Sequence, residues 1–188
     1  MLVPVLLEMG SEAQKKQFIG PTIRGEMLWC QGYSEPGAGS DLASLSTKAV
    51  LDGDDWVING QKIWTSTAHL ADWIFCLVRT EPSKPKHQGI SFLLFRMDTP
   101  GVEVLHRCRF MGLKALYNGV IRITDVKIPK ENMILEEGDG LRLALKTLNT
   151  GRLSIPAGVT GSSKWCMKIN RKWTNKRVQW GHPIGEHE

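Results

Sequence analysis

The sequence predicts an α+β protein, in which a central β-barrel or β-sandwich is flanked by helical segments. Two observations support this fold class. Short strand-like runs, separated by Gly, Pro, Asn and Asp, follow one another from about residue 29 to residue 126. Helical patterns stand on either side of them, at 11–19 and after Gly140.

The N-terminal residues favour helices. Met1–Leu7 is apolar, with no basic flank before it and no small-residue cleavage site after it, so we interpret it as the end of a buried helix and not as a signal peptide. Ser11 is a good N-cap and an acid follows in the first turn. This second helix is expected to end at Gly20-Pro21.

Strands dominate the middle of the chain. Asp52-Gly53-Asp54-Asp55 separates two of them and predicts a tight hairpin turn. The first expected strand is the apolar, aromatic-rich run in the stretch that begins at Glu26, and it ends at Ser34. The others are Lys48–Leu51, Trp56–Ile63, Trp73–Arg79, Ile90–Met97, Val102–Arg107 and Val120–Val126.

The pattern becomes helical after residues 136–140. A stripe of apolar residues with Asp139 as a plausible cap predicts one helix, formed by Leu141, Leu143, Ala144, Leu145 and Leu148. Gly151 and Pro156 predict an interruption near Gly151, followed by a second helix from about 152 to 177.

Composition narrows the class of protein. At 188 residues and 41% hydrophobic content, the chain can bury one substantial core and part of a second. Its longest apolar runs fall well short of the ~20 residues that span a bilayer, so no transmembrane segment is expected. Cys30, Cys76, Cys108 and Cys166 lack CxxC spacing, which predicts neither a zinc site nor a disulfide framework and fits a reduced intracellular compartment.

The net charge of +5 is concentrated near the end of the chain. Residues 139–188 hold nine Lys or Arg against three Asp or Glu. No nucleic-acid motif or base-stacking aromatic pattern accompanies them. We therefore interpret these charges as a solvated basic face and expect no nucleic-acid partner.

The most informative segment is the expected first strand with the loop that follows it, Glu35-Pro36-Gly37-Ala38-Gly39-Ser40. A strand fixes position, and glycines allow a ligand to approach backbone N–H groups closely. The loop is neither the dinucleotide fingerprint nor a P-loop. By itself it is equally consistent with a ligand site and with a plain surface turn.

The order of later motifs decides between these readings. Trp64-Thr65-Ser66 lies in a later strand, Leu148-Asn149-Thr150-Gly151-Arg152 follows near the helical region, and residues 177–185 read RVQWGHPIG. From about Ser11 onward this succession resembles the acyl-CoA dehydrogenases, flavoenzymes that desaturate acyl thioesters. Several motifs in one order are far more specific than any one alone.

The resemblance implies a domain division and an activity. Residues 1–24 correspond to the tail of an N-terminal helical domain, 25–137 to the middle β domain, and 138–188 to the first helices of a C-terminal helical domain. It implies FAD as cofactor, α,β-dehydrogenation of acyl-CoA to trans-2-enoyl-CoA, and electron-transfer flavoprotein as acceptor. It also implies a homodimer or homotetramer in the bacterial cytoplasm or the mitochondrial matrix.

The resemblance also assigns cofactor contacts. It places Gln31, Gly32, Tyr33 and Ser34 beside the flavin pyrimidine edge, and Ser40 at both the cofactor and the CoA portion of the substrate. Trp64, Thr65 and Ser66 form the second flavin segment. Arg177 and Gln179 correspond to residues that reach the adenosine diphosphate part of a neighbouring subunit's flavin.

Asn149 and Arg152 match positions that line the thioester pocket. One branch of the family has its catalytic glutamate directly before this arginine, where the present chain has Gly151, and the commoner version lies beyond Glu188. No catalytic residue is therefore assigned, and the chain alone is expected to be inactive. His187-Glu188 departs from a cofactor-proximal His-Gln or aromatic-Gln pair.

Other interpretations stay open at this stage. Ser34 could cap its own turn, Trp64 could be core packing, and Glu35 is expected to accept local backbone N–H groups rather than act as a base. The same fold could serve a related acyl-CoA or nitroalkane oxidase, or a non-catalytic binding module.

Overall fold

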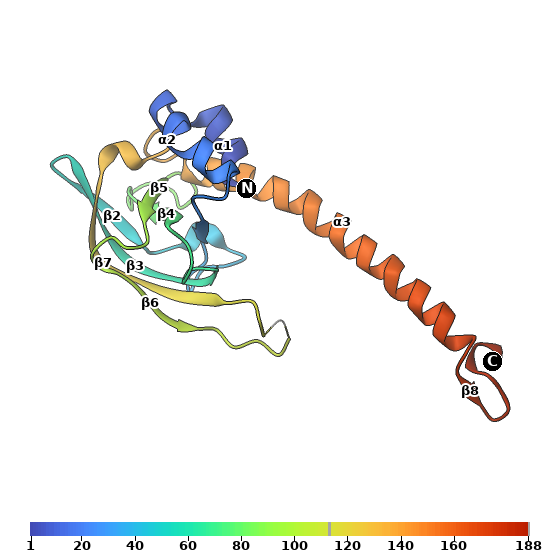
Figure 1. Cartoon of the computed structure of the whole chain (residues 1–188). Helices are drawn as coiled ribbons and strands as arrows, with labels where there is room; N and C mark the ends of the chain where they lie inside the picture. Colours follow the sequence, from blue (N-terminus) through green and yellow to red (C-terminus); the bar gives the residue numbers. More distant parts are fainter. Residues whose placement is uncertain (113, 188) are drawn as a thin grey trace. The chain divides into compact units, whose positions relative to one another are not determined.

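The computed structural model describes residues 1–112 and 114–187, so the expected departure at Glu188 lies outside the described residues. The chain forms two compact units, Met1–Thr147 and Leu148–Glu188. Helices and one large sheet make up the first unit (Figure 1), which confirms the α+β fold class.

Two helices open the first unit. Helix α1 (Leu2–Met9) buries Leu2, Val5 and Leu6. Helix α2 (Glu12–Ile23) begins with the expected N-cap, because the Ser11 hydroxyl accepts from Gln14 N at 3.2 Å and Gln14 Oε1 accepts from Ser11 N at 3.0 Å.

The expected end of α2 at Gly20-Pro21 is wrong, because the helix continues to Ile23. Proline removes only its own N–H from the hydrogen-bond ladder. Beyond it the ladder resumes, with Arg24 N donating to Gly20 O at 3.1 Å. A glycine followed by a proline therefore fails to stop this helix.

The strands form one mixed sheet in the order β1-β4-β2-β3-β7-β6, with β5 pairing to β4. Strand β1 runs parallel to β4, and β3 and β7 pair antiparallel over most of their length. The expected strands are all present. Their bounds are β1 Trp29–Gly32, β2 Lys48–Asp52, β3 Asp55–Ser66, β4 Trp73–Arg79, β5 Ile90–Arg96, β6 Val102–Arg107 and β7 Asn118–Pro129.

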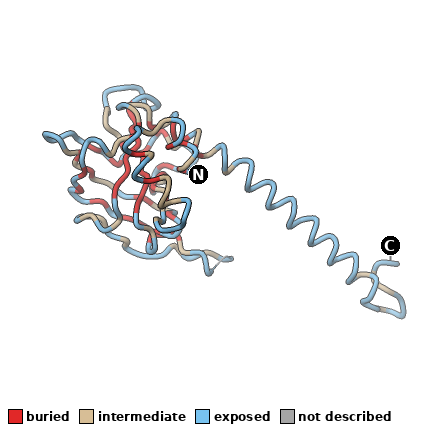
Figure 2. The backbone as a smooth tube through the Cα atoms, turned by 45° about the horizontal axis from the view of Figure 1, so that its top comes forward, coloured by how far each residue is buried: buried red, intermediate tan, exposed pale blue. Residues whose placement is uncertain are grey.

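The core of the first unit lies against this sheet, where Figure 2 shows buried backbone gathered in the strands. Ile58, Ile74 and Ile121 are fully buried members. On α2, Phe18 packs edge-on against Trp73 and Trp29, at centroid distances of 4.9 and 5.4 Å. These aromatic contacts hold α2 on the sheet.

Two irregularities interrupt the pairing of β3 with β7. The register shifts between Ile58 and Gly60 and again between Lys62 and Thr65. The hairpin between β2 and β3 is the expected one, since Asp52 pairs with Asp55 and Gly53 has φ +64°.

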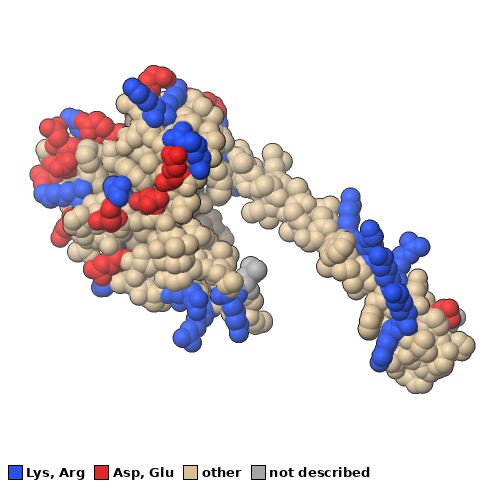
Figure 3. Space-filling model, in the orientation of Figure 1, with Lys and Arg blue, Asp and Glu red and all other residues tan. Residues whose placement is uncertain are grey.

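Helix α3 (Gly140–Thr174) is continuous, so the expected interruption near Gly151 is wrong. Pro156 has no backbone N–H, so the Arg152 carbonyl one turn earlier lacks its usual partner in the helix. Arg152 is exposed, so water can bond to this carbonyl and the helix continues. Lys and Arg side chains gather on the C-terminal half of α3 (Figure 3). Asp139, the expected cap, accepts from Arg142 Nε at 3.1 Å.

The second unit ends in a short hairpin of β8 (Val178–Gln179) and β9 (His182–Pro183). Among the described residues there are also 3-10 turns at η1 Leu42–Ser44, η2 Lys130–Asn132 and η3 Ile184–Glu186. Over residues 1–112 and 114–187, no helix has the length and apolar character needed to cross a membrane, and no cluster of His, Cys, Asp or Glu could hold a metal ion.

Gly60→Ala should destabilise the first unit, because a Cβ at Gly60 would lie 2.7 Å from Thr47 Cα and 2.6 Å from Thr47 Cβ. Relief of such overpacking by backbone shifts costs about 1–3 kcal/mol. Urea unfolding should show a lower midpoint. Gly39→Ala is the matched control, since nothing lies within 4 Å of its added Cβ. Equal midpoints for the two variants would contradict this close approach.

Candidate functional site

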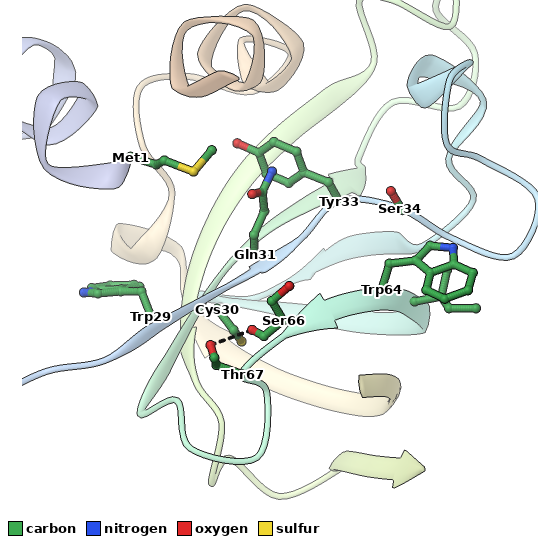
Figure 4. A pocket seen from close by; sticks show the side chains of 10 residues that line it. Met1, Trp29, Cys30, Gln31, Tyr33, Ser34, Trp64, Ser66 and Thr67 are labelled. Carbon is green, nitrogen blue, oxygen red and sulfur yellow. Dashed lines mark hydrogen bonds between the residues drawn. The ribbon is translucent and has the colours of Figure 1, made fainter. Parts of the chain in front are cut away.

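A pocket of about 380 Å³ opens beside the ends of β1 and β3 (Figure 4). In this view Trp29 and Trp64 stand at opposite ends of it, with Gln31 and Ser66 between them. The lining residues are Met1, Trp29, Cys30, Gln31, Tyr33, Ser34, Ile63, Trp64, Ser66 and Thr67.

A backbone hydrogen bond joins the two main walls. Strands β1 and β3 are separated by β4 and β2 in the sheet order. Nevertheless Ile63 N donates to Ser34 O at 2.9 Å, immediately beyond the end of β1. Ser34 and Trp64 consequently face one pocket, although 30 positions separate them in the sequence.

A β-bulge presents Trp64 to this pocket. Lys62 pairs with Ile121 and Thr65 with Gly119, so Ile63 and Trp64 stand opposite a single residue of β7. Trp64 has φ +60°, which is unusual for a non-glycine residue, and the residue is 52% exposed. Bulges redirect side chains in this way next to functional sites.

Phe110 supports the indole of Trp64. The two rings stack with centroids 5.7 Å apart and planes at 24°. Sequence reasoning missed Phe110, because it lies in the segment between β6 and β7 and no local pattern relates it to Trp64. It also missed Trp29, Cys30 and Thr67 as lining residues, although period-two alternation from Gln31 would have placed Trp29 on the same face.

Thr65 and Ser66 differ in their surroundings. Thr65 is fully buried, and its Oγ1 has no hydrogen-bond partner among the described residues. Ser66 is exposed, lines the pocket and donates to Asn118 Oδ1 at 2.7 Å. A buried hydroxyl without a partner costs free energy, but Thr65 is not among the pocket-lining residues, so of these two residues the structure brings Ser66 to the pocket.

Tyr33 lines the pocket on the β1 side, whereas Gly32 is buried and is not among the lining residues. The Tyr33 hydroxyl donates to Thr147 Oγ1 at 2.9 Å, because the Thr147 proton is used in a 2.7 Å bond to Leu143 O. Burial raises the pKa of Tyr33, which keeps the phenol neutral. A Cβ at Gly32 would lie 2.7 Å from Ile74 Cδ1, so a larger residue there would require the Ile74 side chain to shift.

Glu35 follows Ser34 and forms a buried ion pair with Lys62. Glu35 Oε1 lies 2.8 Å from Lys62 Nζ, and the two side chains are 4% and 0% exposed. As expected, Glu35 also accepts backbone N–H groups, from Ser46 at 2.6 Å and Thr47 at 2.9 Å. Burial would raise the Glu35 pKa, but the Lys62 ammonium and these hydrogen bonds outweigh it and lower the pKa to about 2.

The remaining expected site residues lie elsewhere. Ser40 is exposed and is not among the pocket-lining residues. In the second unit, Arg152 Nη1 donates to Asn149 Oδ1 at 3.0 Å. Gln179 lies in β8. When its side-chain amide is turned so that the oxygen faces the Arg177 guanidinium, this oxygen accepts from Arg177 Nε at 3.0 Å.

Family models decide what kind of protein this is. One, described as acyl-CoA dehydrogenase, middle domain, matches residues 30–126, and another, described as acyl-CoA dehydrogenase, C-terminal domain, matches residues 138–188. The chain belongs to the acyl-CoA dehydrogenase family. The resemblance seen in the sequence motifs is thereby confirmed.

Individual acyl-CoA dehydrogenases show the same similarity. The probable acyl-CoA dehydrogenase FadE10 of Mycobacterium tuberculosis is 40% identical over 188 residues, which are 99% of this chain and 29% of that protein. The crystal structure of acyl-CoA dehydrogenase from Geobacillus kaustophilus matches with a TM-score of 0.94 and 31% identity, over 100% of this chain and 50% of that one. Butyryl-CoA dehydrogenase from Megasphaera elsdenii matches with a TM-score of 0.92 and 31% identity, over 98% and 48%.

The present chain therefore spans less than a third of FadE10 and about half of each solved relative. The family comprises flavoproteins of fatty-acid β-oxidation. Because the chain belongs to this family, it belongs to a family of oxidoreductases.

The Glu35–Lys62 pair should make the unfolding free energy of the first unit depend on pH in the acid range. The pKa of the Glu35 carboxyl falls from 4.5 in the unfolded chain to about 2 in the folded protein. At pH values above 4.5, this difference stabilises the folded protein by about 3 kcal/mol. This contribution should be lost as the pH falls from about 4.5 toward 2. Denaturant unfolding from pH 7 to pH 2.5 should show a steeper loss of unfolding free energy for the parent chain than for the double variant Glu35→Gln with Lys62→Met, which leaves no unpaired charge buried. Parallel curves would contradict the lowered pKa.

Proposed function

We propose that this chain provides the flavin-facing and acyl-CoA-facing part of an FAD-dependent acyl-CoA dehydrogenase. The reaction would remove a proton from Cα and a hydride from Cβ of an acyl thioester, leaving a trans-2-enoyl-CoA, with electron-transfer flavoprotein as the final acceptor. The observation that carries the proposal is that Ser34 and Trp64 line one pocket. We assign 1–24, 25–137 and 138–188 to parts of an N-terminal, a middle and a C-terminal domain.

The pocket residues fit a flat, polar-edged ring. A volume of about 380 Å³ lies in the range of small-molecule sites, ~300–1,000 Å³. Gln31 and Ser34 are half-buried on the β1 wall, where an amide and a hydroxyl can bond a pyrimidine edge. Trp64 supplies a broad apolar surface for stacking. Thr65, which is buried and is not a lining residue, is assigned as a flavin contact from the sequence motif alone.

Each part of the chain then has a defined task. Bound flavin would supply the hydride acceptor. The β1 wall would orient the ring through Ser34 and the Gly32 and Tyr33 backbone, and Trp64 would exclude water from one face. Ser66 would place a hydroxyl where negative charge develops, with its proton turned from Asn118 Oδ1 toward the ligand.

Residues outside the pocket complete the proposal. We assign Ser40, Asn149 and Arg152 to the CoA and thioester portions of the substrate. Arg177 and Gln179 would contact the diphosphate part of a flavin held by a second subunit, since a planar guanidinium suits phosphate oxygens. This assignment implies a homodimer or a homotetramer.

Flavin binding tests the pocket directly. Titration of the purified chain with FAD, followed by quenching of flavin fluorescence, should give saturable binding. Trp64→Ala should weaken it roughly tenfold through lost stacking, and Ser34→Ala about fivefold through one lost hydrogen bond.

Trp165→Ala and Ser83→Ala are matched controls outside the pocket, and Trp165 is exposed like Trp64. Both should bind FAD like the parent chain. Binding that is lost equally in Trp64→Ala and Trp165→Ala would contradict the assigned site.

The chain should bind flavin without turning over substrate. Gly151 stands where one branch of the family has its α-proton base, and no other residue of the chain is assigned to that task. Mixing the FAD-loaded chain with a series of acyl-CoA thioesters and an artificial electron acceptor should give no enoyl-CoA above background. Robust turnover would show that a base within this chain has been overlooked.

A further inference from the structure

We propose that the buried Glu35–Lys62 ion pair positions both walls of the pocket, so that Glu35 and Lys62 are positioning residues for the ligand bound between Ser34 and Trp64. The identity of that ligand as a flavin rests on the proposed function. The positioning itself rests on the geometry of residues 33–35 and 62–64.

Three consecutive residues around Ser34 are tied to two consecutive residues of β3. Lys62 Nζ donates to Tyr33 O at 3.3 Å and to Glu35 Oε1 at 2.8 Å. Between these contacts, Ile63 N donates to Ser34 O at 2.9 Å. Ser34 is therefore held on both sides by Lys62 and through its own carbonyl by Ile63.

The same bonds fix the start of the bulge that presents Trp64. Lys62 is the last residue in regular register with β7 before the shift, and Trp64 follows two positions later. A movement of Lys62 would therefore displace the backbone that sets the direction of the indole. One ion pair thus controls the polar wall and the aromatic wall together.

Glu35 connects this arrangement to the rest of the sheet. Its second oxygen, Oε2, accepts from Ser46 N at 2.6 Å and from Ser46 Oγ at 2.8 Å, and Oε1 accepts from Thr47 N at 2.9 Å. These two residues directly precede β2. Glu35 also forms a short bridge with Ala38, which closes the turn after Ser34.

Stability alone does not explain a charged pair at this place. Well-packed apolar residues of similar volume often stabilise a core as well as a buried ion pair does. A charged pair adds direction, because each hydrogen bond is effective only within a narrow range of distance and angle. The geometry therefore points to placement of the pocket walls as the role of these two side chains.

The decisive variant is the double change Glu35→Gln with Lys62→Met. It removes both charges together, so no unpaired charge is left buried and the chain should still fold. Its FAD affinity should fall at least about tenfold, because small displacements of positioning groups are costly. At saturating FAD, the quenching of flavin fluorescence by Trp64 should also be weaker than in the parent chain.

Two controls separate positioning from general stability. Glu103→Gln with Arg122→Met removes an exposed ion pair between β6 and β7 of the same sheet and should leave FAD affinity unchanged. Ile128→Val removes a methyl group from the core and should lower the thermal midpoint without changing the quenching at saturation. Parent-like affinity and quenching in the Glu35/Lys62 double variant would overturn the proposal.

Amide hydrogen exchange gives a readout that needs no flavin. The Ile63 amide, which is bonded to Ser34 O, should exchange at least about tenfold faster in the double variant, while amides of the β4–β5 pair should not change. Unchanged Ile63 exchange would overturn the positioning role. If the parent chain binds no flavin, the proposed function fails, and the Ile63 result still decides the role of the ion pair.

A second double variant, Glu35→Gln with Lys62→Gln, also leaves no unpaired charge buried and provides the same tests if the first double variant does not fold. It should likewise accelerate Ile63 exchange and weaken FAD binding. Parent-like values for both would count against the proposal.

Discussion

The contact between Glu35 and Lys62 is the constraint on which the pocket depends. The carboxylate and the ammonium are both withdrawn from water, so neither can move away from the other without exposing a charge to an apolar interior. Separation of the Ser34 turn from β3 is therefore much more costly than separation of two neutral loops. Two strands that share no ladder in the sheet are kept in contact by this requirement.

Local backbone strain accompanies this contact. Trp64 and Thr67 are non-glycine residues with φ near +60°, and both line the pocket. Such conformations cost of order 1–3 kcal/mol each and persist only where the surroundings determine them. Here the β3–β7 ladder on one side and the Thr67 N to Tyr117 O bond on the other hold the segment in place.

Much of the fold could be predicted from local pattern, whereas the contacts around the pocket could not. Strand β4 has its expected bounds because its apolar residues form one uninterrupted run. Strand β7 extends beyond the expected one, since Asn118-Gly119 at its start resembles a loop in composition. Ser34 and Trp64 were recognised through motifs, but the pairing of Glu35 with Lys62 joins residues 27 positions apart and leaves no periodic signal.

The parallel pairing of β1 with β4 has a consequence for the order of folding. Trp29–Gly32 find their partners at Trp73–Cys76, more than forty residues later in the chain. A nascent polypeptide cannot complete this ladder until β4 has left the ribosome, and closing so long a loop is slow compared with forming the β2–β3 hairpin. The strand bearing the polar wall should therefore dock late, onto β4, after the β2–β3 hairpin has formed.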